Sequence, residues 1–263
     1  MSKLLYANFF RLWRNRLFQI GLGFMFFAGS FLVFQQYRQL VGYGTNVKLD
    51  STMFGYTIMI GVISSIFCSL FVSTDYNDGT IRNKVITGSR RAEIYIANLI
   101  VNIVASFLLC FSYILANIVI GVPLIGTLET PLPKALLILA GSLLTVIAFC
   151  AVFTMISLLI QSKAIAPVVC IVAMFLSIAF FNEVQRILDQ PEFWYDGTVN
   201  TAYVDGTERE VLEFLYNAIP AGQEMQYSRR STENIGEMAA YAAGLTVITT
   251  GIGAFFFNRK DIR

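Results

Sequence analysis

The stretch Ala135–Ile160 reads ALLILAGSLLTVIAFCAVFTMISLLI, and its 26 residues include no Asp, Glu, Lys or Arg. An α-helix rises about 1.5 Å per residue, so a helix of this length can cross the roughly 30 Å hydrocarbon core of a bilayer. A run so long, so apolar and so free of charge is typical of a transmembrane helix. The sequence therefore predicts that this segment spans a membrane.

Five further runs are also long enough to cross a bilayer and likewise lack charged residues. They are Leu17–Phe34, Phe54–Thr74, Ile94–Val122, Ala164–Phe181 and Met238–Phe257. Charged residues make up 14% of the 263-residue chain, against about a quarter in a typical soluble domain. We therefore predict an all-α integral membrane protein, in which residues 1–263 form a single domain with six transmembrane helices. The third run is longer than a bilayer requires, so it tilts or continues beyond the membrane.

The first run is expected to be a retained span rather than a cleaved signal peptide. Its apolar stretch is too long for a signal peptide, and Val33-Phe34-Gln35-Gln36 offers no small-residue cleavage site.

Basic residues predict the orientation of the spans. An even number of spans places both termini on one side, and the segments on that side hold twelve Lys and Arg residues against seven on the other. Acidic residues are distributed in the opposite way, with four against thirteen. Because Lys and Arg near span ends mark the cytoplasmic side, we predict that both termini are cytoplasmic.

Two segments outside the spans have helical patterns. Residues 2–16 place apolar side chains on one helical face and are expected to lie along the inner leaflet, the alternative being a basic anchor without defined structure. Residues 182–237 form the predicted extracellular segment. Within it, Thr207–Glu210 has the spacing of a capping box, followed by an amphipathic run that Pro220 ends. We expect a short helix resting at the outer mouth of the bundle, in a segment too small to be an enzyme domain.

The sequence offers little for catalysis or metal binding. It contains no histidine, and its four cysteines all fall inside predicted spans without a CxxC pair, so we interpret them as small buried hydrophobes. No serine-hydrolase, zinc-protease or paired-aspartate motif is present, which disfavours an intramembrane enzyme. A phosphate-binding G-x-x-x-x-G-K-[ST] motif is also missing, so a transporter would need an ATPase on another polypeptide. Nothing indicates a nucleic-acid partner.

Polar residues within the third span are the strongest polar features at membrane depth. Asn98, Asn102 and Ser106 follow one another at intervals of four residues, so they share a helical face. Such residues hydrogen-bond between helices or line a substrate path. The sequence alone leaves both readings open.

The loop Asp75–Glu93 reads DYNDGTIRNKVITGSRRAE. We expect Asp78 to cap a short helix over Thr80–Thr87 that Gly79 introduces and Gly88 ends. Ile81 and Val85 would form an apolar stripe with Arg82 and Lys84 beside it. A helix of this kind suits docking into a groove on a cytoplasmic partner, but a basic loop that binds anionic lipid fits the composition equally well.

This loop resembles the inner loop of ABC-2-type transporter permeases. The matching residues are Asp75, Gly79-Thr80-Ile81-Arg82-Asn83-Lys84, Gly88-Ser89-Arg90 and Ile94-Tyr95. The closing segment Phe257–Ile262 is similar to the usual F-x-x-[RK]-D-[IL] tail of the family. The span count, the amphipathic leader and the large segment between the fifth and sixth spans extend the resemblance over the whole chain.

The resemblance implies a half-transporter of the bacterial cell membrane. Two permeases, identical or homologous, would associate, and each would dock a separate ABC ATPase subunit that carries ATP and Mg²⁺, with no cofactor on this chain. The 75–93 loop would be the coupling helix, and the 161–163 turn a second contact. The ATPase-coupling residues that the resemblance marks out are Asp75, Asp78, Gly79, Thr80, Ile81, Arg82, Asn83, Lys84, Val85, Gly88, Arg90 and Lys163.

The expected function is therefore export of an amphipathic or hydrophobic cargo, such as an antimicrobial peptide, a drug or a lipid-like molecule. The extracellular segment is longer than the compact hairpin of minimal family members, so their substrates do not transfer to this chain. The alternative is a non-transporting membrane scaffold or sensor that binds a ligand through its acidic extracellular segment.

Overall fold

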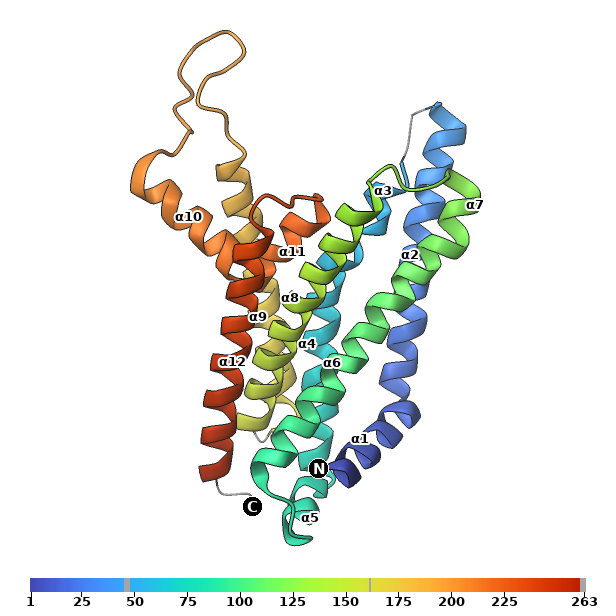
Figure 1. Ribbon diagram of the computed structural model, residues 1–263, viewed down its shortest axis with the longest axis vertical. Helices are drawn as coiled ribbons and strands as arrows, with labels where there is room; N and C mark the ends of the chain where they lie inside the picture. Colours follow the sequence, from blue (N-terminus) through green and yellow to red (C-terminus); the bar gives the residue numbers. More distant parts are fainter. Residues whose placement is uncertain (45–47, 161, 261–263) are drawn as a thin grey trace.

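A computed structural model of the chain describes residues 1–44, 48–160 and 162–260, and the regular structure within these ranges is helical apart from one isolated β-bridge. Figure 1 shows the arrangement. The elements are α1 (Ser2–Arg14), α2 (Arg16–Tyr43), α3 (Asp50–Met53), α4 (Tyr56–Asn77), α5 (Thr80–Ile86), α6 (Arg91–Ala116), the π-helical turn η1 (Asn117–Gly121), α7 (Val122–Ile125), α8 (Leu132–Leu159), α9 (Ile165–Leu188), α10 (Gly206–Ala218), α11 (Pro220–Ser228) and α12 (Ile235–Arg259).

Six helical segments are long and apolar enough to cross a membrane, as the sequence predicts. They are Arg16–Tyr43, Asp50–Asn77, Arg91–Ile125, Leu132–Leu159, Ile165–Leu188 and Ile235–Arg259. Each includes its whole predicted run except for Ile160 and Ala164, and several extend beyond it, as α2 does to Tyr43. The third is the longest of the six, because η1 and α7 continue α6 without a break. The protein therefore has the character of a multi-pass membrane protein.

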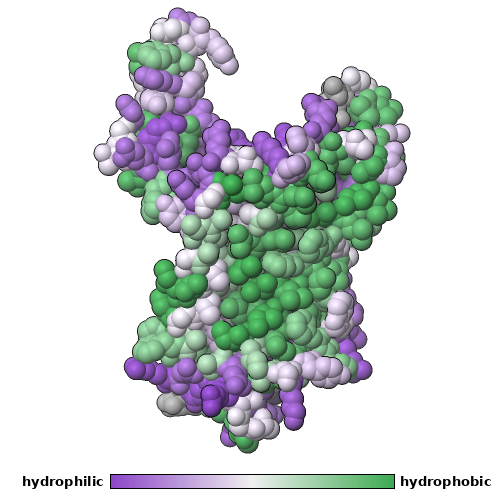
Figure 2. Space-filling view, in the orientation of Figure 1, coloured by the Kyte–Doolittle hydropathy of each residue, from purple (hydrophilic) through white to green (hydrophobic). Residues whose placement is uncertain are grey.

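The two ends of the bundle differ from its middle. The N-terminus, α5 and the last residues of α12 lie at one end, here called the terminal end, whereas α3, α7 and α10 lie at the opposite, distal end (Figure 1). Figure 2 shows a broad apolar band around the middle of the visible face, with hydrophilic residues gathered at both ends. This distribution matches a protein whose middle contacts lipid and whose ends contact water.

Small residues allow the central helices to pack closely. α4 and α8 are the most buried of the six spans, and α12 is the least buried. On α4, a Cβ at Gly61 would come within 2.2 Å of the Met174 side chain on α9. On α12, a Cβ at Gly253 would come within 2.2 Å of the Tyr95 hydroxyl on α6. Close approach through glycine is the common way for helices to associate in lipid, where the hydrophobic effect offers no drive between them.

The segment 182–237 departs from its prediction in two ways. Its first residues belong to α9, which continues to Leu188. The predicted capping box is wrong, since α10 begins at Gly206 and its N-cap is Asp205, whose carboxylate accepts a 2.7 Å hydrogen bond from the Gly206 amide. The rest of this segment up to α10 is a hairpin-like excursion with one bridge between Phe193 and Val199.

The predicted cap is also incomplete, because α11 enters the bundle. All residues from Pro220 to Tyr227 are buried, and α11 packs against α4, α8, α9 and α10. Pro220 does not only follow α10; it also occupies the first turn of α11, where a missing amide proton costs nothing. Gly222 is needed at the tight turn between the two helices, since a Cβ there would lie 2.4 Å from the Tyr216 carbonyl oxygen.

The seating of α11 gives a first prediction. Gly222→Ala should lower the stability of the protein by about 1–3 kcal/mol, the usual cost of overpacking, because the backbone of α10 cannot move aside as a flexible side chain would. Gly244→Ala on α12 is the matched control, since a Cβ there meets nothing within 4 Å and alanine favours a helix. Thermal unfolding of both variants in detergent micelles measures the difference, and a Gly222→Ala protein as stable as the wild type would contradict the packing.

Candidate functional site

The short helix α5 lies at the terminal end, between α4 and α6. Gly79 and Gly88 flank it with φ values of 66° and 89°, a left-handed conformation that glycine adopts without strain. The predicted cap is wrong: Gly79 occupies the N-cap position and no side chain caps the helix. Instead, the Thr80 hydroxyl donates hydrogen bonds to the Asp75 carboxylate (2.6 Å) and to the Asp75 backbone carbonyl (2.9 Å).

Asp75 is the centre of a buried ionic cluster. Its side chain is only 1% exposed, and it forms ion pairs with Arg11 of α1 and with Lys84 of α5, the latter over 3.1 Å. The Lys84 ammonium also donates a 2.9 Å hydrogen bond to the side-chain oxygen of Asn8 on α1. We call these five residues, Asn8, Arg11, Asp75, Thr80 and Lys84, the Asp75 cluster. It joins α1, the end of α4 and α5 into one unit.

The two cations of the cluster are partly removed from water. Burial lowers the pKa of Arg11 to about 10, an effect that the neighbouring Asp78 partly offsets. Burial, together with the charge of Arg11, lowers the pKa of Lys84 to about 8. Both therefore remain mostly protonated near neutral pH. The Arg11 guanidinium also lies over the Phe71 ring of α4, 3.8 Å from its centroid, a contact that favours a cation removed from water.

The cluster decides which face of α5 is free. Ile81 is fully buried and Val85 packs against the core. Because Lys84 is bound to Asp75, the exposed face consists of Arg82, Asn83 and Ile86, the last with 71% of its surface accessible. The expected stripe of Ile81 and Val85 therefore faces the protein's own bundle, and Ile86 is the apolar residue that a partner could reach.

Other residues of the predicted coupling set lie around this end. Gly88 and Arg90 are exposed in the link between α5 and α6, and Lys163 is exposed between α8 and α9. The end of α12 is tied to the same region, because the Lys260 ammonium donates a 3.1 Å hydrogen bond to the Leu158 carbonyl at the end of α8. Gln161 of the predicted second contact, and Asp261 and Ile262 of the family-like tail, lie outside the described residues.

No family model matches the chain, and no curated protein does so either. The function is therefore inferred from the residues themselves.

The polar residues of the third span lie inside the bundle. Asn98, Asn102 and Ser106 are fully buried. The Asn102 amide donates a 2.8 Å hydrogen bond to Thr154 of α8, and Ser106 accepts a 3.0 Å bond from Ser64 of α4. These bonds support the interhelical reading of the sequence. The side-chain oxygens of Asn98 and Asn102 have no hydrogen-bond partner, so each can still accept a hydrogen bond.

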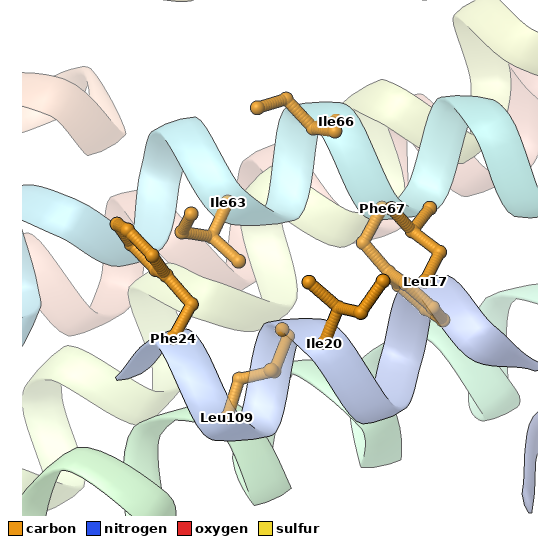
Figure 3. Close-up of a pocket in the computed structure, with 8 residues that line it drawn as sticks. Leu17, Ile20, Phe24, Ile63, Ile66, Phe67 and Leu109 are labelled. Carbon is orange, nitrogen blue, oxygen red and sulfur yellow. The ribbon is translucent and has the colours of Figure 1, made fainter. Parts of the chain in front are cut away.

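A hollow of about 150 Å³ between α2, α4 and α6 is a weaker candidate site. Figure 3 shows that its labelled side chains are all apolar, with Phe24 of α2 extending toward Ile63 of α4. Binding sites usually combine an apolar lining with a few placed polar groups that orient a ligand. This hollow has none, and it is suited only to hydrocarbon. Among the residues that the structure describes, no cluster of metal-ligating side chains is present.

Three residues of these sites stand in no motif of the sequence: Asn8, Arg11 and Glu224. The pattern of residues 2–16 predicts only an interfacial helix, whereas Asn8 binds Lys84 and Arg11 pairs with Asp75. Glu224 belongs to the predicted extracellular segment 182–237, and the structure buries it among the helices of the bundle. The available signal for Glu224 was the pairing of Pro220 with Gly222, which permits a second helix to turn back against the first.

The Asp75 cluster generates a second prediction. Asp75→Asn should destabilise the protein by about 1–3 kcal/mol, at or below the lower end of the cost of breaking a buried ion pair, because Arg11 and Lys84 can still reach water. Asp78→Asn removes the same charge from an exposed position three residues away and should change stability by less than about 0.5 kcal/mol. Equal melting temperatures for the two variants would show that the cluster does not hold this end together.

Proposed function

We propose that the protein is the permease subunit of an ATP-driven exporter of the ABC-2 type, resident in a bacterial cell membrane. It moves an amphipathic or hydrophobic cargo out of the cell and takes its energy from a separate ATPase subunit. A second permease copy, identical or homologous, completes the transporter. The proposal joins the family resemblance of the 75–93 loop to six membrane-length helices and a sequence without a phosphate loop.

The observation that carries the proposal is the attachment of α5. The Asp75 cluster binds α5 to α1 and to α4, while Arg82, Asn83 and Ile86 stay exposed at the terminal end. A force that a partner applies to this exposed face would therefore reach α4, one of the two most buried spans. A loop that only bound anionic lipid would not need such an attachment.

The cargo path is proposed to be closed in this conformation. Asn98, Asn102 and Ser106 are fully buried, so a path that they line has to open by separating α6 from α4 and α8. Hydrolysis of ATP on the partner supplies the work for that separation.

The docking face gives a third prediction. The variant Arg82→Glu with Ile86→Asp should reduce recovery of the proposed ATPase partner by about 10–100-fold, since central contacts of an interface contribute about 2 kcal/mol or more. Lys134→Glu makes a matched charge reversal on an exposed residue at the distal end and should leave recovery unchanged. The measurement is co-purification of the two co-expressed chains, with ATP hydrolysis as a second readout.

If the docking variant retains both assembly and ATP hydrolysis, the coupling role of α5 is wrong. Accumulation of cargo in inverted vesicles separates the exporter from the scaffold alternative. A scaffold or sensor would show no ATP-dependent flux.

The proposed orientation gives a fourth prediction. The four native cysteines are buried, so single cysteines introduced at exposed positions can be labelled over a low background. A membrane-impermeant maleimide should label Asp196→Cys in intact cells, because the 189–205 excursion is proposed to be extracellular. Thr87→Cys, beside α5, should be labelled only after permeabilisation. The reverse pattern would invert the topology and remove α5 from the cytoplasm.

A further inference from the structure

The helix α11 carries two neighbouring buried polar residues, one whose side chain is hydrogen-bonded and one whose side chain is not. Gln223 is fully buried, and its side chain is completely bonded: the amide donates to the Asn217 carbonyl (2.7 Å) and the Met238 carbonyl (2.9 Å), and its oxygen accepts from Thr145 (2.7 Å). These bonds fasten α11 to α10, α12 and α8. Gln223 thus explains how a polar helix can be held inside the bundle.

Glu224 is buried without such partners. Its side chain is 2% exposed, and neither carboxyl oxygen has a hydrogen-bond partner. The Gly61 amide of α4 lies near the carboxyl but does not meet the geometry of a hydrogen bond. The Glu224 backbone carbonyl, by contrast, is bonded outside α11, as it accepts from the Thr57 hydroxyl of α4 over 3.1 Å.

The groups that face Glu224 provide no positive charge. The titratable side chains that interact with it electrostatically are Tyr56 of α4, Cys110 of α6, Cys150 of α8 and Tyr227 of α11. Tyrosine and cysteine side chains are uncharged acids near neutral pH. The helices α9 and α10 also pack against α11. Among the residues that the structure describes, neither helix contributes a charge that shifts the pKa of Glu224.

A series of polar groups continues from Glu224 toward the terminal end. Cys150 lies 3.2 Å from the Ser106 hydroxyl, and its thiol also points to the Asn102 carbonyl at 3.6 Å. Asn102 in turn donates to Thr154, and Asn98 lies one turn further along α6. We call Ser64, Asn98, Asn102, Ser106, Cys150 and Thr154 the polar column. Glu224 lies at the distal end of this column, which runs through the centre of the bundle.

We propose that Glu224 is a proton-binding site, which carries a proton while α11 is seated in the bundle and releases it when α11 moves toward the distal surface. On release, the carboxyl O–H bond breaks, the proton passes to water, and a carboxylate remains. A carboxyl buried without a partner among membrane-length helices is costly, so a function for it is the default hypothesis.

Two physical arguments support this site. Burying a carboxylate without a cation or hydrogen-bond donors costs far more free energy than burying the neutral acid, so the group keeps its proton. Burial accordingly raises the pKa of Glu224 well above the ordinary value. Conversely, an ionised Glu224 favours any conformation in which it meets water, and α11 is the part of the bundle that continues directly into the distal segment.

The proposal does not require the ATPase partner, because it concerns the chain alone. It is tested with the purified full-length chain in detergent micelles, whether or not an ATPase binds α5. Failure of either proposal leaves the other standing.

Infrared spectroscopy tests the protonation state directly. The wild-type protein should show a carbonyl-stretching band of a protonated carboxylic acid at neutral pH that Glu224→Gln lacks, and the band should fade as the pH is raised. Glu237→Gln, an exposed carboxyl at the start of α12, is the control and should leave the band intact. A wild-type spectrum without this band at neutral pH, or a band that Glu224→Gln retains, would overturn the proposal.

The pH dependence of stability gives an independent measurement, the fifth prediction. The folded protein holds a proton on Glu224 that an unfolded chain loses above a pH of about 4.5, so this contribution to stability is complete below that value and falls as the pH rises toward the elevated folded pKa. The melting temperature of the wild type should therefore decrease from about pH 6 to about pH 9 relative to Glu224→Gln. Glutamine has the shape of the protonated acid, so this variant should fold. Parallel pH profiles for the two proteins would contradict the site.

Discussion

The structure depends on one constraint: within hydrocarbon, a polar group that finds no partner inside the protein costs several kcal/mol, so most are paired and a charged one is rarely left alone. Two buried carboxylates, one at each end of the bundle, are paired in this way. Asp75 is surrounded by side chains of α1 and α5 at the terminal end. At the distal end, buried Asp50 accepts hydrogen bonds from the backbone amides of Glu129 (2.9 Å) and Thr130 (2.8 Å), which ties α3 to the link before α8. Both carboxylates thereby fix connections between spans.

The spans could be predicted from sequence because the signal for each is local. A helix of sufficient length without charge is stable in a bilayer without further partners, so the sequence predicts the span around Ala135–Ile160 and its five counterparts. The helices extend beyond the apolar runs, as α2 does to Tyr43 and α9 to Leu188. Apart from Pro220 and Gly222, which permit the turn between α10 and α11, no local signal marks the burial of α11. The segment Pro220–Ser228 contains Gln223, Glu224 and Gln226, and it is buried only because residues from distant helices, such as Thr145 and Thr57, bond to it.

The candidate site likewise combines features that the local sequence predicts with features that depend on distant residues. Gly79 and Gly88 correctly predict a short helix between them, because left-handed glycines end helices wherever they occur. The orientation of that helix could not be predicted, since Lys84 is directed inward by Asp75 and by Asn8, which is 76 residues away in the sequence. A period of four residues identifies a stripe such as Ile81 and Val85, but does not say whether it faces a partner or the protein's own core.

The two proposed sites meet on α4. At the terminal end, α4 carries Asp75, which holds α5; toward the distal end, its Thr57 binds the backbone of Glu224, and its Gly61 lies beside the carboxyl. Between them, Ser64 joins α4 to the polar column through Ser106. A displacement of α5 that shifts α4 would therefore disturb the hydrogen bond that seats α11 and the surroundings that keep Glu224 neutral. If a partner drives α5, loss of the proton from Glu224 becomes a consequence of the same movement, and the re-entry of α11 resets the bundle by restoring a neutral, buried acid.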